Sequence, residues 1–535
     1  MAHEVATVPA WSAVHPPPAA SRRRRPPPLG VVTYLLAQAV LAFWWVARYP
    51  GLFSPDSLDH VWQATSGNWN THHPITYTAL VWLSVRLTGG IGALTLAQTA
   101  ALAAGLAYAV TGLRRLGGPV WAWGAAAVTL VALPPVGTFT VCVWKDVPFV
   151  ICHVFLLGVL ARLVTRGRTH RSPLSRGPLG GTLLLLTLIC LFRQNGFLVA
   201  MVVTGLIAVL VRGAALRVLL AGLIAATVAL LTNWLLLPAV GARDSGSIVA
   251  YEAFLGDLAV GYAAAPTEFP PADLALLARV APLTHWRDSA DCHIVDPTVY
   301  GADFDRRVAE QHRDELLAAW WRLARRSPGT VLAARICRGA IAWRPDSTGG
   351  LRTNPTAWAL PIYLDRDPRF HDPEVRAVAY TRPLNDRVRT AADQLSRLVS
   401  GPEWLLWRGA TWAWLAYLAV GLAAWRRRDR TVLALAALSA GNQLSVLVVN
   451  NAQAARYMAA PYALGVLLSP LLAARDPAQP ATDPGTAPGW TGRPATASAP
   501  ATDAGAPLRV TDLTVAAEPA VAEPDPDQAR TDERG

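Results

Sequence analysis

The 535-residue chain has a single lysine, Lys145, although it contains 48 lysine and arginine residues in total. A lone lysine in a chain that otherwise uses arginine indicates that position 145 needs a compact ammonium group and not a planar guanidinium fork. An alternative is a chance residue at a membrane edge, with its stem on apolar surface and its ammonium reaching the interface. Composition alone favours neither interpretation.

Charge is also scarce. Only 16% of the residues are charged, against roughly a quarter in soluble domains, while 53% are hydrophobic and the mean hydropathy is +0.29. Because long runs with almost no charge recur, the sequence predicts an all-α polytopic membrane protein. The net charge of +12 does not indicate a nucleic-acid partner, since the arginines gather in short loops between apolar runs.

The five cysteines contain no CxxC pair, so zinc binding and thioredoxin-type chemistry have no sequence support. Cys142, Cys152 and Cys190 lie in or beside apolar runs. Cys292 and Cys337 share one long hydrophilic region, and a disulfide between them is open if that region lies in an oxidising compartment.

Motifs of soluble enzymes are missing as well. The chain has no GxxxxGK[ST] motif, no GxGxxG motif between a strand and a helix, and no GxSxG motif. An enzyme with this sequence would therefore take its activated group from a molecule already in the membrane.

The apolar runs predict about ten transmembrane helices. The basic clusters, such as Arg114-Arg115 and Arg426 to Arg428, all fall on the cytoplasmic side if the short apolar stretch 74–88 lies along the outer surface. The first helix is then an uncleaved span and both termini are cytoplasmic, in a multi-pass protein of the cell membrane. The expected spans are 31–48, 91–112, 119–141, 147–164, 179–192, 196–211, 216–239, 404–425, 431–450 and 457–473.

This topology divides the chain into five regions: a disordered cytoplasmic tail 1–28, a transmembrane domain 29–239 with a catalytic-type outer loop 49–90, an α-rich extracytoplasmic domain 240–403, closing membrane helices 404–473, and a second disordered tail 474–535. Within the large outer domain, Asp303 to Arg326 predicts an amphipathic helix. His285, Asp288, Asp291 and His293 also cluster there, but without a known ligand spacing, which favours a solvated loop over a metal site.

Ionisable residues concentrate in the first outer loop. Asp56 follows Pro55 directly after a membrane helix, where a carboxylate can accept a proton from a hydroxyl nucleophile. A helix cap by Ser54 or Asp56 is the structural alternative. Asp59 lies one helical turn further and could share a proton or a cation with Asp56. His72-His73 could orient the base or a substrate, or form a polar turn into 74–88.

Three further outer turns each contribute a cation: Lys145-Asp146, Arg193-Gln194-Asn195, and Arg456 within 450–457. Isolated cations on the outer side run against the topological charge bias, so we expect them to form a joint site for an anion. Phosphate is the obvious candidate beside a lipid phase. The alternatives are an interfacial anchor for Arg193 and a capped turn for the asparagines.

The acidic residue in the first outer loop, the His-Pro start of the surface helix and the late outer domain resemble the GT-C superfamily of membrane glycosyltransferases, which includes protein O-mannosyltransferases and the aminoarabinose transferases of lipid A. The runs 144–149 (WKDVPF) and 193–196 (RQNG) also resemble a group of bacterial multi-pass proteins placed near that superfamily. The resemblance covers roughly residues 31–473.

The resemblance implies a sugar donor on a polyprenyl phosphate, an extracytoplasmic glycan, lipid or protein acceptor, and an inverting displacement. It maps the acidic residue onto Asp56, less surely onto Asp59, and the phosphate ligands onto Lys145, Arg193 and Arg456. No cofactor is certain. The carboxylates are spaced DxxD where the family has DxD, so a divalent metal stays an open question.

Two other functions remain open at the level of sequence. A polysaccharide polymerase or ligase also uses lipid-linked sugars and outer-loop arginines. A transporter or flippase is less favoured, because the chain shows no internal repeat and the polar groups noted inside the spans are His153 and Asn233, which helix packing can satisfy.

Overall fold

The computed structural model describes residues 28–166, 176–244, 248–346, 364–365, 367–380, 382–399 and 401–474. In these ranges the regular elements are all helices, and pairing of the β type is limited to three isolated bridges. The described residues belong to one unit, Met1–Gln479. The two predicted tails lie outside the described residues, apart from Pro28 and Ala474.

Five helices of the described chain are long and apolar enough to cross a membrane: Leu29–Ala47, Gly92–Leu116, Asp146–Thr165, Arg212–Ala239 and Arg430–Val449. The protein therefore combines an all-helical fold with several helices of membrane-spanning character. A sixth candidate is the pair α5 (Val120–Ala132) and α6 (Pro134–Thr140), which is bent by 69° at its break. Two consecutive prolines follow Leu133, and each removes a backbone donor from the helix.

The predicted count of ten spans exceeds these five or six. Two expected spans correspond to α8 (Arg176–Phe192) and α9 (Gly196–Leu210), which have 17 and 15 residues against the roughly 20 that a membrane requires. Two others are divided into shorter pieces, namely α22 (Glu403–Leu406) with α23 (Gly409–Arg427), and η9 (Ala455–Met458) with α25 (Ala459–Leu468) and η10 (Ser469–Ala473).

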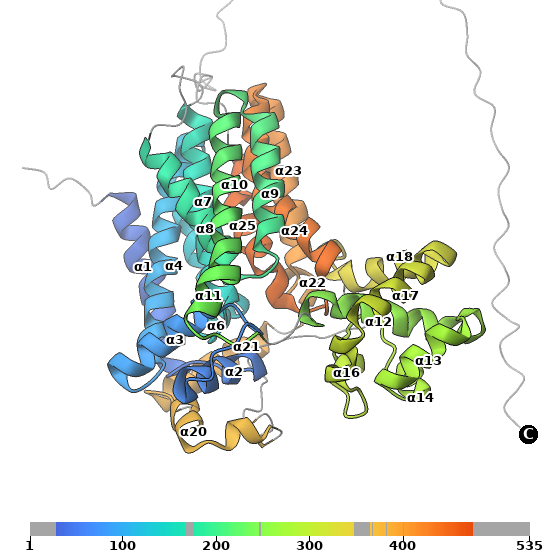
Figure 1. Ribbon diagram of the computed structural model, residues 1–535. Helices are drawn as coiled ribbons and strands as arrows, with labels where there is room; N and C mark the ends of the chain where they lie inside the picture. The colour runs from blue at the N-terminus through green and yellow to red at the C-terminus, as the bar shows by residue number, and fades with distance from the viewer. Residues whose placement is uncertain are drawn as a thin grey trace, which may run out of the picture. The chain divides into compact units, whose positions relative to one another are not determined.

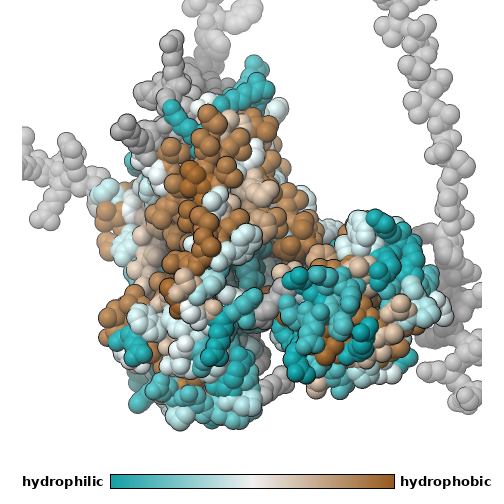
Figure 2. Space-filling model, in the orientation of Figure 1, coloured by the Kyte–Doolittle hydropathy of each residue, from teal (hydrophilic) through white to brown (hydrophobic). Residues whose placement is uncertain are grey.

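The apolar helices pack into one bundle. In Figure 1, α1 (Leu29–Ala47) and α7 (Asp146–Arg166) lie on either side of α4 (Gly92–Leu113), and α8 and α9 pack against α10 (Ala215–Leu231). α24 (Ala437–Val449) packs against α9, and α23 against α25. Short helical turns extend these elements: η1 (Arg114–Leu116), η2 (Arg212–Ala214), η3 (Thr232–Leu236), α11 (Leu237–Ala239) and η8 (Arg430–Ala436). Figure 2 shows hydrophobic residues gathered along the visible face of the bundle.

Polar groups inside the apolar helices bond to the backbone. His153 is buried and its Nδ1 lies 2.8 Å from the Phe149 carbonyl oxygen, as expected for a packing group. Asn233 Nδ2 donates to the Ala229 carbonyl over 2.9 Å, but the residue is exposed and is not a packing group. The sequence interpretation overlooked Gln98 on α4 and Asn442 on α24. Both are buried and both donate to backbone carbonyls outside their own helices.

Two helices follow α1 at one end of the bundle, which we call the site end. α2 (Pro55–Ser66) and α3 (Ile75–Thr88) pack against each other there (Figure 1). The expected surface helix 74–88 is thus confirmed as a helix of 14 residues, too short to span. Its position along a membrane surface stays a prediction.

The region between the bundle helices forms two helical groups. The first has its own apolar core, around Leu258, Trp286 and Leu316. It contains α12 (Ile248–Ala264), η4 (Pro266–Glu268), α13 (Pro271–Val280), α14 (Leu283–Asp288), α15 (Asp296–Val299), α16 (Arg306–Gln311), α17 (Arg313–Arg326), α18 (Pro328–Arg338) and η5 (Gly339–Ala342). The helix expected over 303–326 is therefore two helices, separated at His312.

The second group packs against the bundle and against α2. η7 (Pro368–His371) and α20 (Pro373–Ala379) pack against α2, and α21 (Asp386–Leu398) packs against α1. An ion pair of 2.6 Å joins Arg48, which follows α1, to Asp393 on α21. In the first group, Cys292 and Cys337 form a disulfide with Cα atoms 5.8 Å apart, which answers the question left open by the sequence.

Candidate functional site

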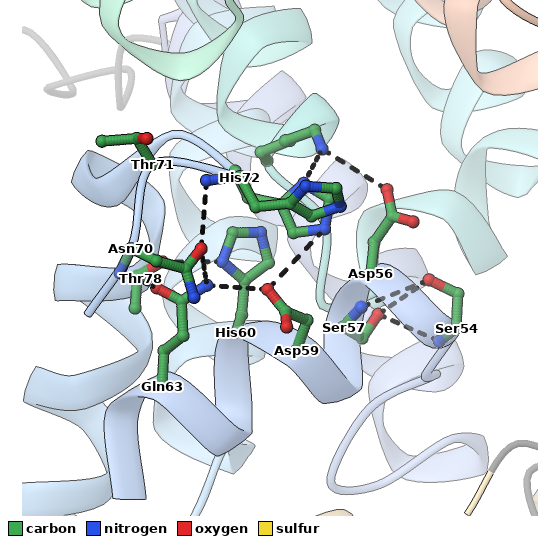
Figure 3. Close-up of polar contacts among 12 residues, drawn as sticks. Ser54, Asp56, Ser57, Asp59, His60, Gln63, Asn70, Thr71, His72 and Thr78 are labelled. Carbon is green, nitrogen blue, oxygen red and sulfur yellow. Dashed lines mark hydrogen bonds and ion pairs between the residues drawn. The ribbon is translucent and has the colours of Figure 1, made fainter. Parts of the chain in front are cut away.

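Ser54, and not Asp56, caps the helix that begins the first loop. The Ser57 N–H donates to Ser54 Oγ over 3.3 Å, and the Ser54 N–H donates to Ser57 Oγ over 3.0 Å (Figure 3). Pro55 occupies the first helical position, where its missing N–H costs nothing. The Asp56 carboxylate in the first turn is therefore free to point away from the helix, beside its favourable dipole.

A hydrogen-bonded frame brings this loop to the start of α7. Trp144 Nε1 donates to Ser54 Oγ over 2.8 Å, and Leu52 forms a parallel bridge with Cys142. Gln98 on α4 supports the same segment, because its Nε2 donates to the carbonyls of Thr140 and Cys142 over 2.9 and 3.1 Å. The frame fixes Lys145 opposite the first turn of α2.

Asp56 lies between two cations. Its Oδ2 is 3.4 Å from Lys145 Nζ and 3.0 Å from Arg456 Nη1. The Arg456 guanidinium also lies 5.1 Å from the centre of the Trp144 ring. Burial opposes ionisation of Asp56, but the charges of Arg456 and Lys145 outweigh burial and hold the pKa of Asp56 well below its usual value. In this state Asp56 is an ionised carboxylate.

Lys145 has a second partner in His73. Its Nζ lies 2.8 Å from His73 Nδ1, which is an acceptor when the ring is neutral. Burial, with the repulsion of Lys145, keeps the pKa of His73 well below its usual value, so a neutral ring fits this geometry. Burial also lowers the pKa of Lys145, although Asp56 and Asp146 act against that change.

Arg193 forms a neighbouring group with Asp146 and Asn195. Its Nη1 is hydrogen-bonded to Asp146 Oδ1, and its Nε donates to Asn195 Oδ1 over 3.0 Å. Asn195 Nδ2 donates in turn to Ser445 Oγ over 2.9 Å. The Tyr457 ring lies 4.8 Å from the Arg193 guanidinium and 5.3 Å from that of Arg456. All three expected cations therefore come together, but Asn195 uses its amide within the protein.

Asp59 has a separate set of partners. It accepts hydrogen bonds from Arg369 Nη1 over 2.8 Å and from Gln63 Nε2 over 2.7 Å, and His73 Nε2 lies 4.0 Å away. In Figure 3, Asp56 and Asp59 point to different neighbours. This arrangement gives Asp59 the role of joining α2 to η7. Arg369 was not anticipated, because nothing in the sequence around it links it to the first loop.

The histidine rings of the first loop lie against one another in tilted arrangements. The ring of His73 lies 4.9 Å from that of His60 and 4.6 Å from that of His72, measured between centroids. His60 Nδ1 lies 2.8 Å from Thr78 Oγ1 on α3. His72 is half-buried and its N–H donates to Asn70 Oδ1 over 3.0 Å. His73 therefore contacts the charged group directly, whereas His72 contacts it through His73.

An apolar cleft begins at this charged group. Arg456 and Trp144 belong to its lining. From there it continues between α5, α6, α7 and α25. The apolar lining includes Leu102, Leu130, Val136, Phe139, Val147, Val150, Ile151, Ala459 and Ala463. A largely apolar cleft with an arginine in its lining suits an amphiphile with an anionic head.

The donor sets of the described residues do not fit a metal ion well. Asp56 and Asp59 both face cations. The group Cys292, His293 and Cys337 has the proximity of a ligand set, but its two thiols are joined in the disulfide. His285 Nε2 lies 2.8 Å from the Thr298 carbonyl oxygen and His293 Nδ1 lies 2.9 Å from Asp291, so both histidines have partners within the protein. The loop interpretation of this cluster was wrong for His285 and Asp288, which lie on α14.

The turn 450–457 contacts the first helical group, which runs from α12 to η5, through its side-chain amides. Asn450 Nδ2 donates to the Arg338 carbonyl over 2.8 Å, Gln453 Nε2 donates to the Cys337 carbonyl over 2.7 Å, and Asn451 donates to Glu252 on α12. Burial, reinforced by the negative charge of Asp296, raises the pKa of Glu252 to about 8. Sequence reasoning missed Glu252, since it lies inside an apolar run.

Comparison of the chain with family models, with curated proteins and with solved structures finds no match in any of the three.

Proposed function

We propose that this protein is an integral membrane glycosyltransferase, which transfers a sugar from a polyprenyl-phosphate donor to an acceptor outside the cytoplasm. The observation that carries the proposal is the position of Arg456, which pairs with Asp56 and also lines the apolar cleft. A lipid phosphate bound to Arg456 would have its prenyl chain beside the apolar wall and its anomeric carbon near Asp56. Ligand sites commonly combine an apolar lining with a few convergent polar groups.

In the proposed reaction, an acceptor hydroxyl oxygen attacks the anomeric carbon of the sugar. The bond between that carbon and the phosphate oxygen breaks, and its electron pair stays on the phosphate. Asp56 takes the hydroxyl proton. Lys145 and Arg456 stabilise the phosphate as its charge grows in the transition state, which is the form of electrostatic catalysis that preorganised cations provide. A single displacement of this kind inverts the anomeric configuration.

We expect binding of the donor phosphate to change the pKa of Asp56. Since Arg456 and Lys145 hold that pKa down, a bound phosphate that draws both cations toward itself would let the pKa of Asp56 rise. Burial, which raises the pKa of Asp56, would then be opposed less by the two cations. Donor binding would in this way convert a paired carboxylate into an effective base.

The finer topology belongs to the same proposal. About ten spans, a juxtamembrane α3 and an extracytoplasmic domain over 240–403 would put the site end outside the cell, with both termini in the cytoplasm. The Cys292–Cys337 disulfide supports this side for the domain, because structural disulfides persist in oxidising compartments.

The test is transfer from a panel of polyprenyl-phosphate-linked sugars, measured as release of polyprenyl phosphate by purified, reconstituted protein. Asp56→Asn should lower the rate by about 10²- to 10⁴-fold, the usual loss of a general base. Asp393→Asn is the matched control, because it removes a carboxylate from an ion pair with Arg48 at the same end of the bundle. Full activity in a folded Asp56→Asn protein would refute the assignment.

A further inference from the structure

α18 exposes an apolar face, whereas a helix in water exposes polar residues. Its exposed residues are Pro328, Gly329, Leu332, Ala333 and Ile336, which follow one stripe of the helix and include no charged side chain. Leu332 is 60% exposed and Ile336 is 46% exposed. A helix on a soluble domain normally places its polar residues on that side.

The charged residues of α18 point inward instead. Arg338 is buried and its Nη1 lies 3.0 Å from Asp257 Oδ1, while Arg335 Nε lies 2.6 Å from Asp257 Oδ2. Asp257 on α12 is itself buried. The pairing with Asp257 offsets the cost of taking these charges out of water. The inward direction of both arginines leaves the outer side of α18 apolar.

α18 is held at the site end of an apolar span. Arg335 Nη1 donates to the Val448 carbonyl over 3.2 Å, and α18 packs against α24. Val448 and Val449 are exposed at the end of that span, which runs from Arg430 to Val449. The exposed stripe of α18 thus lies next to a surface whose composition already suits lipid.

Aromatic residues stand at the same end. Trp414 Nε1 on α23 donates to the Trp343 carbonyl over 2.8 Å, and both indole side chains are exposed, by 50% and 39%. Exposed tryptophans at helix ends are typical of the membrane interface, where the ring meets headgroups. These contacts are independent of the charged site around Asp56.

We propose that α18 lies in the interfacial layer of the bilayer, with Leu332, Ala333 and Ile336 among the lipids. Eleven residues are too few to cross a membrane, but they suffice for a helix that lies in its plane. Contact with lipid would remove the exposed apolar surface of Leu332 and Ile336 from water, which is favourable. The partner is a lipid surface, and the helical domain 248–343 would be fixed to it through α18.

Spin labels test this placement in the full-length protein in lipid nanodiscs. Ala333→Cys puts the label on the exposed stripe, and Ala278→Cys on α13 is the matched control. Both are exposed alanines of one domain, but α13 packs against α14, α16 and α17. The buried Cys142, Cys152 and Cys190 are replaced by alanine, and the disulfide is kept.

The measurement is the collision rate of each label with oxygen, which concentrates in lipid, and with a water-soluble nickel chelate. We expect oxygen to dominate at position 333 and the chelate to dominate at position 278. Equal chelate access at both positions would overturn the proposal, since α18 would then face water. Shielding of position 333 from both reagents would overturn it too, in favour of a covering protein surface. Leu332→Cys provides a second reading of the same stripe.

Discussion

At the scale of single residues, Lys145 has a defined environment. It is the only lysine of the chain, it lies directly before α7, and it contacts both Asp56 and His73. A guanidinium fork would fit these two partners less freely than an ammonium group with three rotating donors. The contacts therefore support the chemical interpretation of the lone lysine over chance.

For the proposed transferase, the pKa of Lys145 predicts an alkaline limit to activity. Burial lowers this pKa, so the cation is present at low and neutral pH and is lost, as pH rises, earlier than for an ordinary lysine. In Lys145→Arg the cation persists to higher pH. We expect the alkaline limb of kcat/KM to move upward in that variant, and Lys145→Met to be impaired at every pH.

The pH dependence of kcat/KM reports the ionisable groups of the free enzyme. An alkaline limb at the same pH in the wild type and in Lys145→Arg would show that another group controls it. Release of polyprenyl phosphate from the donor provides the rate in all three proteins.

At the scale of elements, α2 and α3 meet through His60. The side chain is buried and bonds to Thr78 on α3. Its other ring nitrogen, Nε2, is buried without a hydrogen-bond partner. Burial lowers the pKa of His60 to about 3, with a further contribution from Lys145. The folded state thus requires a neutral ring at this position.

This requirement predicts acid destabilisation. The pKa of His60 is lower in the folded than in the unfolded chain, where it is about 6.5. Its stabilising effect is therefore complete above pH 6.5 and is lost as pH falls from there toward 3, by at most on the order of 5 kcal/mol. His60→Gln should flatten the fall in thermal midpoint over this range in detergent or nanodiscs. If the thermal midpoint of His60→Gln falls with pH as steeply as that of the wild type, His60 does not control the acid destabilisation.

The same elements show what sequence patterns can and cannot predict. The apolar runs correctly indicated helices at α1, α4, α7 and α10, because composition decides burial in a membrane. They overstated continuity at α5 and α6, since hydropathy averages over the two prolines that bend the chain. They also treated 303–326 as one helix, where the structure has a break at His312.

At the scale of the whole molecule, the site gathers residues that are distant in sequence. The clustering of Asp56, Lys145, Arg193 and Arg456 follows from one idea, that outer turns meet at one end of a bundle. The individual pairings could not be predicted. Arg369 with Asp59 and Asn451 with Glu252 depend on tertiary contacts of the large helical region, for which local sequence carries no signal.

The central claim is that Lys145 and Arg456, which pair with Asp56, are also the cations that bind the phosphate of the lipid donor. Binding of polyprenyl phosphate to Asp56→Asn tests this most directly, measured as a dissociation constant beside the wild-type value in nanodiscs. Removing the competing carboxylate leaves both cations to the phosphate. The account therefore predicts affinity equal to or tighter than wild type in a variant whose transfer rate is lowered by about 10²- to 10⁴-fold. Weaker binding, or none, by a folded Asp56→Asn protein would contradict it.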